Sequence, residues 1–145
     1  QQRGFTSVDF ARLHPGGSLG RRLLMTVGNV MRDHDLPVVG PDCSVVEMIH
    51  TISKGGLGLI VICDGDRIEG IVTDGDVRRA MERLKGDFFN IRARDIATPH
   101  PKTIGTGEKL IEAERVMTRN KITSLLVTDG DGKLAGVIQI YDIKL

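Results

Sequence analysis

The chain has 145 residues and is 40% hydrophobic, enough to bury one ordinary domain or two half-size units sharing a core. Its 20 basic and 19 acidic side chains leave a net charge of +1, which argues against a nucleic-acid-binding arm or a polybasic membrane patch. Aromatic residues are only 3%, which argues against base-stacking platforms, and no apolar run approaches the roughly 20 residues of a membrane span. Cys43 and Cys63 lack metal-ligand spacing and predict two reduced thiols in a cytoplasmic protein.

Residues 1–27 are a lead-in with a glycine-rich, basic motif, HPGGSLGRR, at positions 14–22. The motif lacks the spacing of a P-loop. One interpretation is a flexible turn before a short apolar helix at residues 23–27. The other is a role for His14 as a general acid or base, because the ordinary pKa of imidazole lies near neutrality.

The rest of the chain contains an internal repeat. LIVICDGDRIEGIVTDGD at residues 59–76 matches LLVTDGDGKLAGVIQIYD at residues 125–142, at an offset of 65 to 66 positions. The match predicts one repeat at 28–86 and a second at 92–145.

In the first repeat, apolar residues at helical spacing over 45–52 predict a helix, with Ser44 and Glu47 as a capping box. Strands follow at 59–63 and 68–73, joined by an Asp-Gly-Asp turn. A second helix runs to Leu84, with Asp74 or Asp76 as its N-cap.

The second repeat follows the same order, with a helix over 110–117 and strands at 124–128 and 134–140. Its last helix is cut short, because the chain stops at Leu145. Each repeat therefore predicts strand, helix, strand, strand, helix. The twelfth residue of an EF-hand loop counted from Asp64 or Asp129 is not Glu, so the Asp-Gly stretches predict hairpin turns, not calcium sites.

The segment Thr73-Asp74-Gly75-Asp76 lies where a strand leads into a helix. A hydroxyl, carboxylates and free helix N–H groups meet there, which suits a ribose diol and a phosphate, and Arg78 and Arg79 could contact an anion. The alternative is a capped helix start with solvated arginines.

The second repeat has Asp142 in register with Asp76, but Gln139 replaces the threonine. Lys121, Thr123 and Ser124 precede the adjacent strand and could line a cleft, although a solvated turn explains them equally well.

GIVTDGDVRR at 70–79 and GVIQIYD at 136–142 resemble the hallmark of paired CBS domains. The resemblance implies an α+β fold (α/β-like) of tandem βαββα repeats, packed as a pseudo-two-fold Bateman module over residues 28–145. Many enzymes, channels and transporters carry such pairs, so this pattern is specific for the fold and not for the function.

GFTSVDFARLHPGGSLGRRLL at residues 4–24 resembles the junction between the sugar-isomerase domain and the CBS pair of bacterial D-arabinose 5-phosphate isomerases. Those enzymes convert D-ribulose 5-phosphate to D-arabinose 5-phosphate for Kdo biosynthesis, which feeds lipopolysaccharide or capsule. The resemblance implies that an isomerase domain precedes this chain and that His14 acts in the active site of a neighbouring subunit. It implies enediol chemistry without a required cofactor, and no activity for this chain alone.

The resemblance also implies that Thr73 and Asp76 contact a nucleotide ribose, with Gln139 and Asp142 forming a less typical second site. CMP-Kdo is the expected regulatory ligand because it ends the pathway, ahead of AMP or another nucleotide. The expected partner is a second copy, giving a dimer of the pair and a tetramer of the parent. The alternatives are a ligand-free dimerisation module, and the sensor pair of an unrelated enzyme or transporter.

Overall fold

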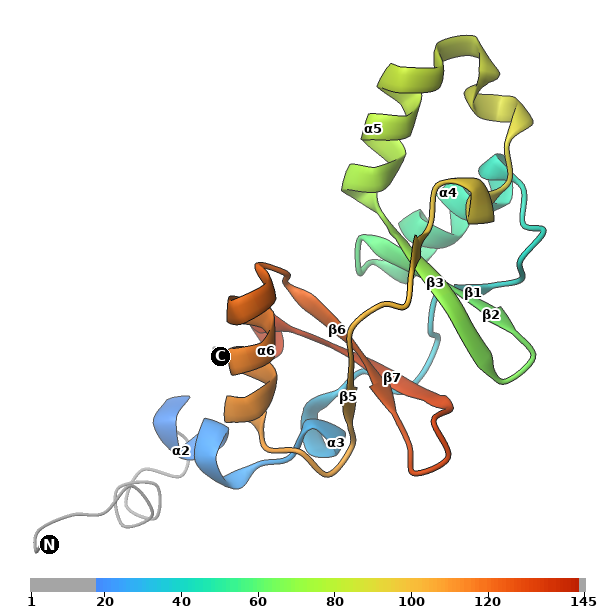
Figure 1. Cartoon of the computed structure of the whole chain (residues 1–145). Coiled ribbons are helices and arrows are strands. Elements are labelled where there is room, and N and C mark those ends of the chain that lie inside the picture. The colour runs from blue at the N-terminus through green and yellow to red at the C-terminus, as the bar shows by residue number, and fades with distance from the viewer. Residues whose placement is uncertain (1–17, 144–145) are drawn as a thin grey trace, which may run out of the picture. The chain divides into compact units, whose positions relative to one another are not determined.

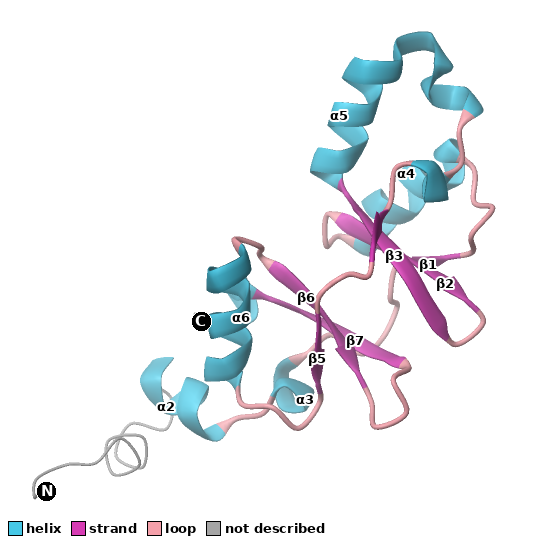
Figure 2. Cartoon of the chain, in the orientation of Figure 1, coloured by secondary structure: helices cyan, strands magenta, loops and turns pink. Residues whose placement is uncertain are grey.

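A computed structural model describes residues 18–143, which form two compact units. The first unit is Asp35–Pro101, and the second combines residues 18–34 with residues 102–143. Figures 1 and 2 show a separate sheet in each unit, flanked by helices. Within residues 18–143, no helix has both the length and the apolar character to cross a bilayer.

The 35–101 unit has a four-stranded sheet in the order β1-β2-β3-β4. Strand β1 (Val38–Val39) runs parallel to β2 (Leu59–Asp64), which pairs antiparallel with β3 (Arg67–Thr73). Strand β4 (Thr98–Pro99) closes the other edge, antiparallel to β3. The parallel pair needs a crossover, which helix α4 (Val45–Gly55) supplies between β1 and β2.

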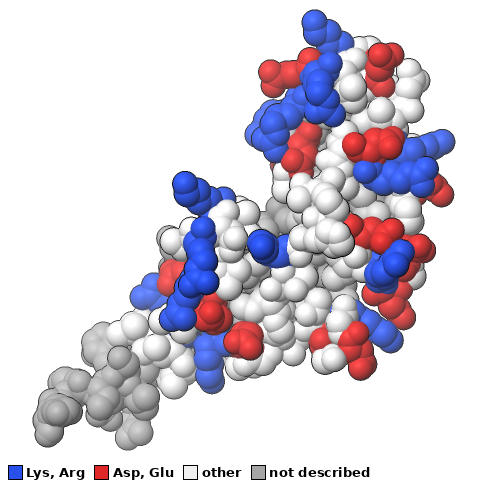
Figure 3. Space-filling view, in the orientation of Figure 1, with Lys and Arg blue, Asp and Glu red and all other residues white. Residues whose placement is uncertain are grey.

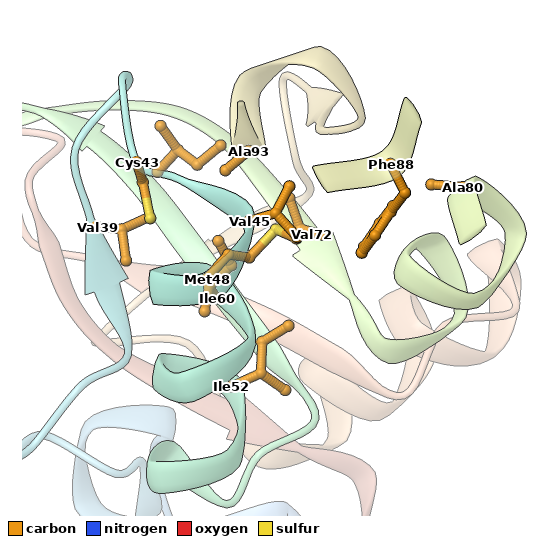
Figure 4. Packing of buried hydrophobic residues seen from close by; sticks show 11 residues of the cluster. Val39, Cys43, Val45, Met48, Ile52, Ile60, Val72, Ala80, Phe88 and Ala93 are labelled. Carbon is orange, nitrogen blue, oxygen red and sulfur yellow. The ribbon is translucent and has the colours of Figure 1, made fainter. Parts of the chain in front are cut away.

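Helix α5 (Asp74–Leu84) follows β3, and two short 3-10 helices, η1 (Lys85–Asn90) and η2 (Ala93–Asp95), lead back to β4. Figure 4 shows the apolar side chains of α4, the strands and η1 meeting in one core. Met48 and Ile60 are completely buried at its centre, and Phe88 fills the side next to α5. The core residues are Val39, Cys43, Val45, Met48, Ile52, Ile60, Ile62, Val72, Ala80, Phe88 and Ala93.

The second unit has a three-stranded sheet in the order β5-β6-β7. Strand β5 (Thr103–Gly105) is parallel to β6 (Ser124–Thr128), and β6 is antiparallel to β7 (Leu134–Gln139). Helix α6 (Leu110–Asn120) makes the crossover, and α7 (Ile140–Ile143) follows β7. The predicted α+β order of two βαββα repeats is thus confirmed.

Two helices of the lead-in also belong to the second unit, α2 (Ser18–Leu24) and α3 (Val27–Val30). Val27 is fully buried in the core of this unit. The other buried members of that core are Ile104, Leu110, Ala113, Met117, Leu125, Val127, Ile138 and Ile143. The predicted apolar helix at residues 23–27 was wrong in its position, because the chain leaves the helical conformation after Leu24 and starts a new helix at Val27.

Each sheet accepts a segment from the start of the other sequence repeat. Pro99 pairs with Gly70 on β3, and Arg32 exchanges two backbone hydrogen bonds with Val137 on β7. A Cβ atom on Gly70 would lie 2.9 Å from the Thr98 carbonyl oxygen, and one on Gly136 would lie 2.6 Å from the Arg32 carbonyl oxygen. The mid-strand glycine of each repeat is therefore needed for a close approach of two backbones. The repeat boundaries 28–86 and 92–145 stay a prediction about the sequence.

Two local predictions needed correction, and a third is confirmed in part. Neither Asp74 nor Asp76 is the N-cap of α5, because Thr73 takes that position. Strand β7 ends at Gln139, since Ile140 already begins α7. The Ser44 hydroxyl accepts a hydrogen bond from the Glu47 N–H at 3.2 Å, which is the first of the two bonds of the predicted capping box.

Cys43 and Cys63 are both free thiols, as predicted. Burial raises the pKa of each thiol above its ordinary value, and for Cys43 the nearby Glu47 carboxylate adds to this effect. Because the thiolate is the nucleophile and the metal ligand, both side chains are held in the unreactive form at neutral pH.

The substitution Gly136→Ala should destabilise the chain by about 1–3 kcal/mol, because the new methyl group overlaps the Arg32 carbonyl and the Met31 sulfur. Gly107→Ala is the matched control, since a Cβ at this exposed glycine meets nothing within 4 Å. Urea unfolding followed by circular dichroism measures both. Equal urea midpoints for the two variants would contradict the close approach of the Gly136 and Arg32 backbones.

Candidate functional site

The junction of β3 and α5 places the first group of predicted site residues. The Thr73 hydroxyl accepts a hydrogen bond from the Asp76 N–H at 3.2 Å, and the Thr73 N–H donates to the Asp76 carboxylate at 3.0 Å. Both bonds close a capping box at the start of α5. Thr73 and Asp76 are therefore fixed relative to each other by the same bonds that start the helix.

An arginine completes this group. The Arg79 guanidinium donates to the second oxygen of the Asp76 carboxylate at 2.7 Å. The Asp76 side chain is only 17% exposed, whereas Arg79 is 67% exposed. Each carboxylate oxygen can accept two hydrogen bonds, so Asp76 retains capacity for the hydroxyls of a ribose. Arg78 is exposed on the same turn and is free to turn toward an anion.

Lys and Arg side chains gather along α5 in the space-filling view of Figure 3. The basic residues of this helix are Arg78, Arg79 and Arg83, against Asp74, Asp76 and Glu82. The acidic residues stand mainly in the first turn, where the helix dipole favours them, and the basic ones follow. A phosphate held near the start of α5 would thus meet both N–H groups and guanidinium groups.

The junction of β7 and α7 is built differently. The Gln139 N–H donates to the Asp142 carboxylate at 2.8 Å, as the Thr73 N–H does to Asp76. The Gln139 side-chain amide instead donates to the Ser124 hydroxyl on β6, also at 2.8 Å. Gln139 therefore uses its polar group to tie two strands together, where Thr73 caps a helix.

The remaining predicted residues lie beside this junction. The Thr123 carbonyl accepts a hydrogen bond from the Ile140 N–H, and Thr123 itself is exposed. Lys121 ends α6 in the left-handed conformation, with φ of 56°, and is also exposed. The second group thus brings Ser124, Gln139 and Asp142 into contact, with Thr123 adjacent through the backbone.

His14 lies outside the described residues. Among residues 18–143, no group of three or more His, Cys, Asp or Glu side chains could hold a metal ion.

Sequence reasoning missed a groove of about 630 Å³ between α4 and α5. It is lined by Ile49, Ile52, Ser53, Gly56, Gly58, Asp74, Val77 and Met81. Ile49 is 39% exposed and Met81 is 47% exposed, although both belong to the apolar stripes that predicted the helices. Periodicity indicates which residues share a helix face, but it cannot tell a closed core from an open groove.

Comparison with known proteins places this geometry in a family. The CBS domain family model matches residues 27–83 and 93–144. Among solved structures, CBSX2 in complex with AMP shares 26% of its sequence with the chain at a TM-score of 0.69, over 82% of this chain and 92% of that one. A signal-transduction protein with CBS domains from Burkholderia ambifaria shares 27% at a TM-score of 0.73, over 82% and 90%.

Curated relatives have a longer sequence. Arabinose 5-phosphate isomerase KpsF of Escherichia coli O6:H1 is 42% identical over 97% of this chain, and arabinose 5-phosphate isomerase KdsD of Yersinia pestis is 41% identical over the same share. The chain spans 43% of the length of either relative. The two family matches cover more than half of the chain, and the βαββα order repeats in the structure. The chain therefore belongs to the CBS domain family, with two CBS domains in tandem.

Proposed function

We propose that the chain is the regulatory, nucleotide-sensing part of an arabinose 5-phosphate isomerase. The similarity to relatives of that name over nearly the whole chain supports the parent activity. The arrangement of Thr73, Asp76 and Arg79 supports the ligand class, because it offers a hydroxyl, a carboxylate and a cation at one helix start. The AMP complex of CBSX2, a relative in fold and sequence, agrees with a nucleotide.

In the proposed parent, a base moves a proton between two adjacent carbons of the sugar phosphate through an enediol intermediate. His14 would contribute to that active site in a neighbouring subunit, in a cytoplasmic enzyme that requires no cofactor. The regulatory ligand would be CMP-Kdo, since the product of a pathway is a suitable signal for its early enzyme, with CMP, AMP and ATP as the alternatives.

The two junctions predict unequal sites. At the first, Thr73 and Asp76 present a hydroxyl and a carboxylate, with Arg78 and Arg79 available for phosphate. At the second, Gln139 and Asp142 present an amide and a carboxylate, with Lys121, Thr123 and Ser124 beside them. We therefore expect the first site to hold the ribose in the manner typical of CBS domains, and the second to require a different orientation.

Asp76→Ala should weaken nucleotide binding at the first site about tenfold or more, because hydrogen bonds to a charged carboxylate are lost. Isothermal titration calorimetry with CMP-Kdo, CMP, AMP and ATP measures the effect. Ser44→Ala is the matched control, since it removes the N-cap of α4 and should cost about 1 kcal/mol of stability without touching the site. Arg78→Ala tests the phosphate contact without disturbing the capping box. Unchanged affinity in both site variants would refute the assignment of the first site.

The chain of residues 1–145 should not convert D-ribulose 5-phosphate to D-arabinose 5-phosphate, because the relatives have more than half of their length outside the matched region. A coupled assay of the purified chain tests this, with a full-length relative as the positive control. Turnover by the chain alone would mean that the catalytic groups lie within it.

A ligand-free dimerisation module is the second candidate, and the groove between α4 and α5 favours it. Ile49 and Met81 expose apolar surface there that a second copy could cover. Dimerisation and nucleotide sensing are compatible, so the second candidate replaces the first only if no nucleotide binds.

Met81→Glu should convert a dimer into a monomer, since it places a charge in an apolar contact. Glu82→Ala changes the neighbouring exposed residue outside the groove lining and should leave the dimer intact. Sedimentation velocity distinguishes the two states. A wild-type chain that sediments as a monomer at micromolar concentration would remove support for this contact.

A further inference from the structure

Two adjacent arginines attach helix α2 to the second unit. The Arg21 guanidinium donates to the backbone carbonyl of Asp142 in α7 at 2.7 Å. The Arg22 guanidinium donates to both carboxylate oxygens of Glu114 in α6, at 3.1 and 3.2 Å. The side chains of Arg22 and Glu114 are only 27% and 21% exposed, so water screens this ion pair less than one at the open surface. Helix α2 thus holds one charged contact to each of the two helices that flank β6 and β7.

The chain after α2 is fixed to the start of α6 by backbone hydrogen bonds. The Leu110 N–H donates to the Met25 carbonyl at 3.0 Å, and the Val27 N–H donates to the Glu108 carbonyl at 2.7 Å. The Lys109 ammonium donates to the Leu24 carbonyl at 3.3 Å. The carboxyl end of α2 is therefore anchored by these bonds and by the two arginine contacts of its last turn.

The described part of α2 depends on tertiary contacts for its stability. The described segment Ser18–Leu24 has seven residues, and a helical segment of that length is not stable in water without tertiary contacts. The Nε atoms of Arg21 and Arg22 are buried without a hydrogen-bond partner within the described residues, which lowers the gain from docking. Leu24 remains 46% exposed.

Asp142 belongs both to this contact and to the second candidate site. Its carboxylate accepts a hydrogen bond from the Gln139 N–H and its backbone carbonyl accepts one from Arg21. A ligand that binds the carboxylate would further hold the turn of α7, and with it the carbonyl to which Arg21 donates. We propose that nucleotide binding at Gln139 and Asp142 stabilises the docked position of α2, so that the lead-in senses the occupancy of the second unit. This inference rests on the proposed nucleotide-sensing function.

Coupling between two sites is reciprocal. A change that releases α2 must therefore weaken nucleotide binding by the factor by which the nucleotide favours the docked helix. Arg22→Glu places two carboxylates against each other and should release α2 without touching Asp142. We expect the Kd for AMP or CMP at the second site to rise about fivefold or more. The double variant Arg22→Glu with Glu114→Arg restores the ion pair in reverse and should return the Kd to within about twofold of the wild-type value.

Arg115→Glu is the matched control, because it reverses an arginine charge on α6, the helix of Glu114, without involving α2. Among the described residues Arg115 pairs only with Glu112 of its own helix. It should change neither the Kd nor the exchange of α2. Calorimetry with AMP and CMP gives the affinities, in an Asp76→Ala background that weakens the first site and leaves the second unaltered. Hydrogen exchange of residues 18–24 reports the docking of α2, which should be slower with nucleotide and faster in Arg22→Glu. Arg22→Gln, which removes the pair without repulsion, serves if the charge reversal prevents folding.

A weaker Kd in Arg22→Glu that the double variant reverses supports the inference. An unchanged Kd together with faster exchange in α2 overturns the coupling and leaves the proposed sensing function intact. Exchange in α2 that does not respond to Arg22→Glu overturns the role of the ion pair. A wild-type chain that binds neither AMP nor CMP at either site overturns the proposed function and this inference with it. The titration of the wild-type chain alone distinguishes this outcome from a failure of the coupling.

Discussion

The close approach of two backbones at a mid-strand glycine is the constraint on which both units depend. At Gly70 and Gly136 the neighbouring carbonyl oxygen occupies the space that a Cβ would need. Each glycine thereby admits a segment that covers the edge of β3 or β7 and completes the sheet beside the core. Thr73 and Gln139 stand three residues further along the same strands. Each junction thus lies three residues beyond the point where a neighbouring segment joins the sheet.

The regular elements could be predicted from the sequence because their patterns are local. The stripes that place Met48 and Met117 in the two cores, and the Asp-Gly turns between strands, depend only on residues close in the chain. The pairing of β4 with β3 could not be predicted, since two residues carry too little pattern. The sequence predicts an aspartate as the N-cap of α5, whereas the hydroxyl of the threonine before it takes that position. Propensity alone ranks these side chains too closely to choose between them.

The sequence predicted which polar residues stand at the two strand-to-helix junctions, but not the contacts that they make there. Spacing brought Thr73 and Asp76 to one helix start, as a strand-to-helix junction requires. Nothing in the sequence indicated that the Gln139 amide would bind Ser124 on the neighbouring strand, because that contact depends on strand register. The ion pair of Arg22 with Glu114 joins residues 92 positions apart, so local sequence patterns could not predict it either. The two junctions share a carboxylate and a backbone bond, and differ in the other polar groups beside the carboxylate, a hydroxyl and an arginine at the first and an amide at the second.

Each sequence repeat contributes a short segment to the sheet of the other repeat, and this limits how such a chain can be altered. Residues 27–34 pack with the second unit, and residues 98–101 pack with the first. In this arrangement each repeat depends on the other for one edge of its sheet. Losing a copy would leave a strand edge open to association with other chains, so the arrangement favours an even number of repeats. Grafting or permuting the chain respects its physical units only if the cuts fall after His34 and after Pro101, where the chain passes from one unit to the other.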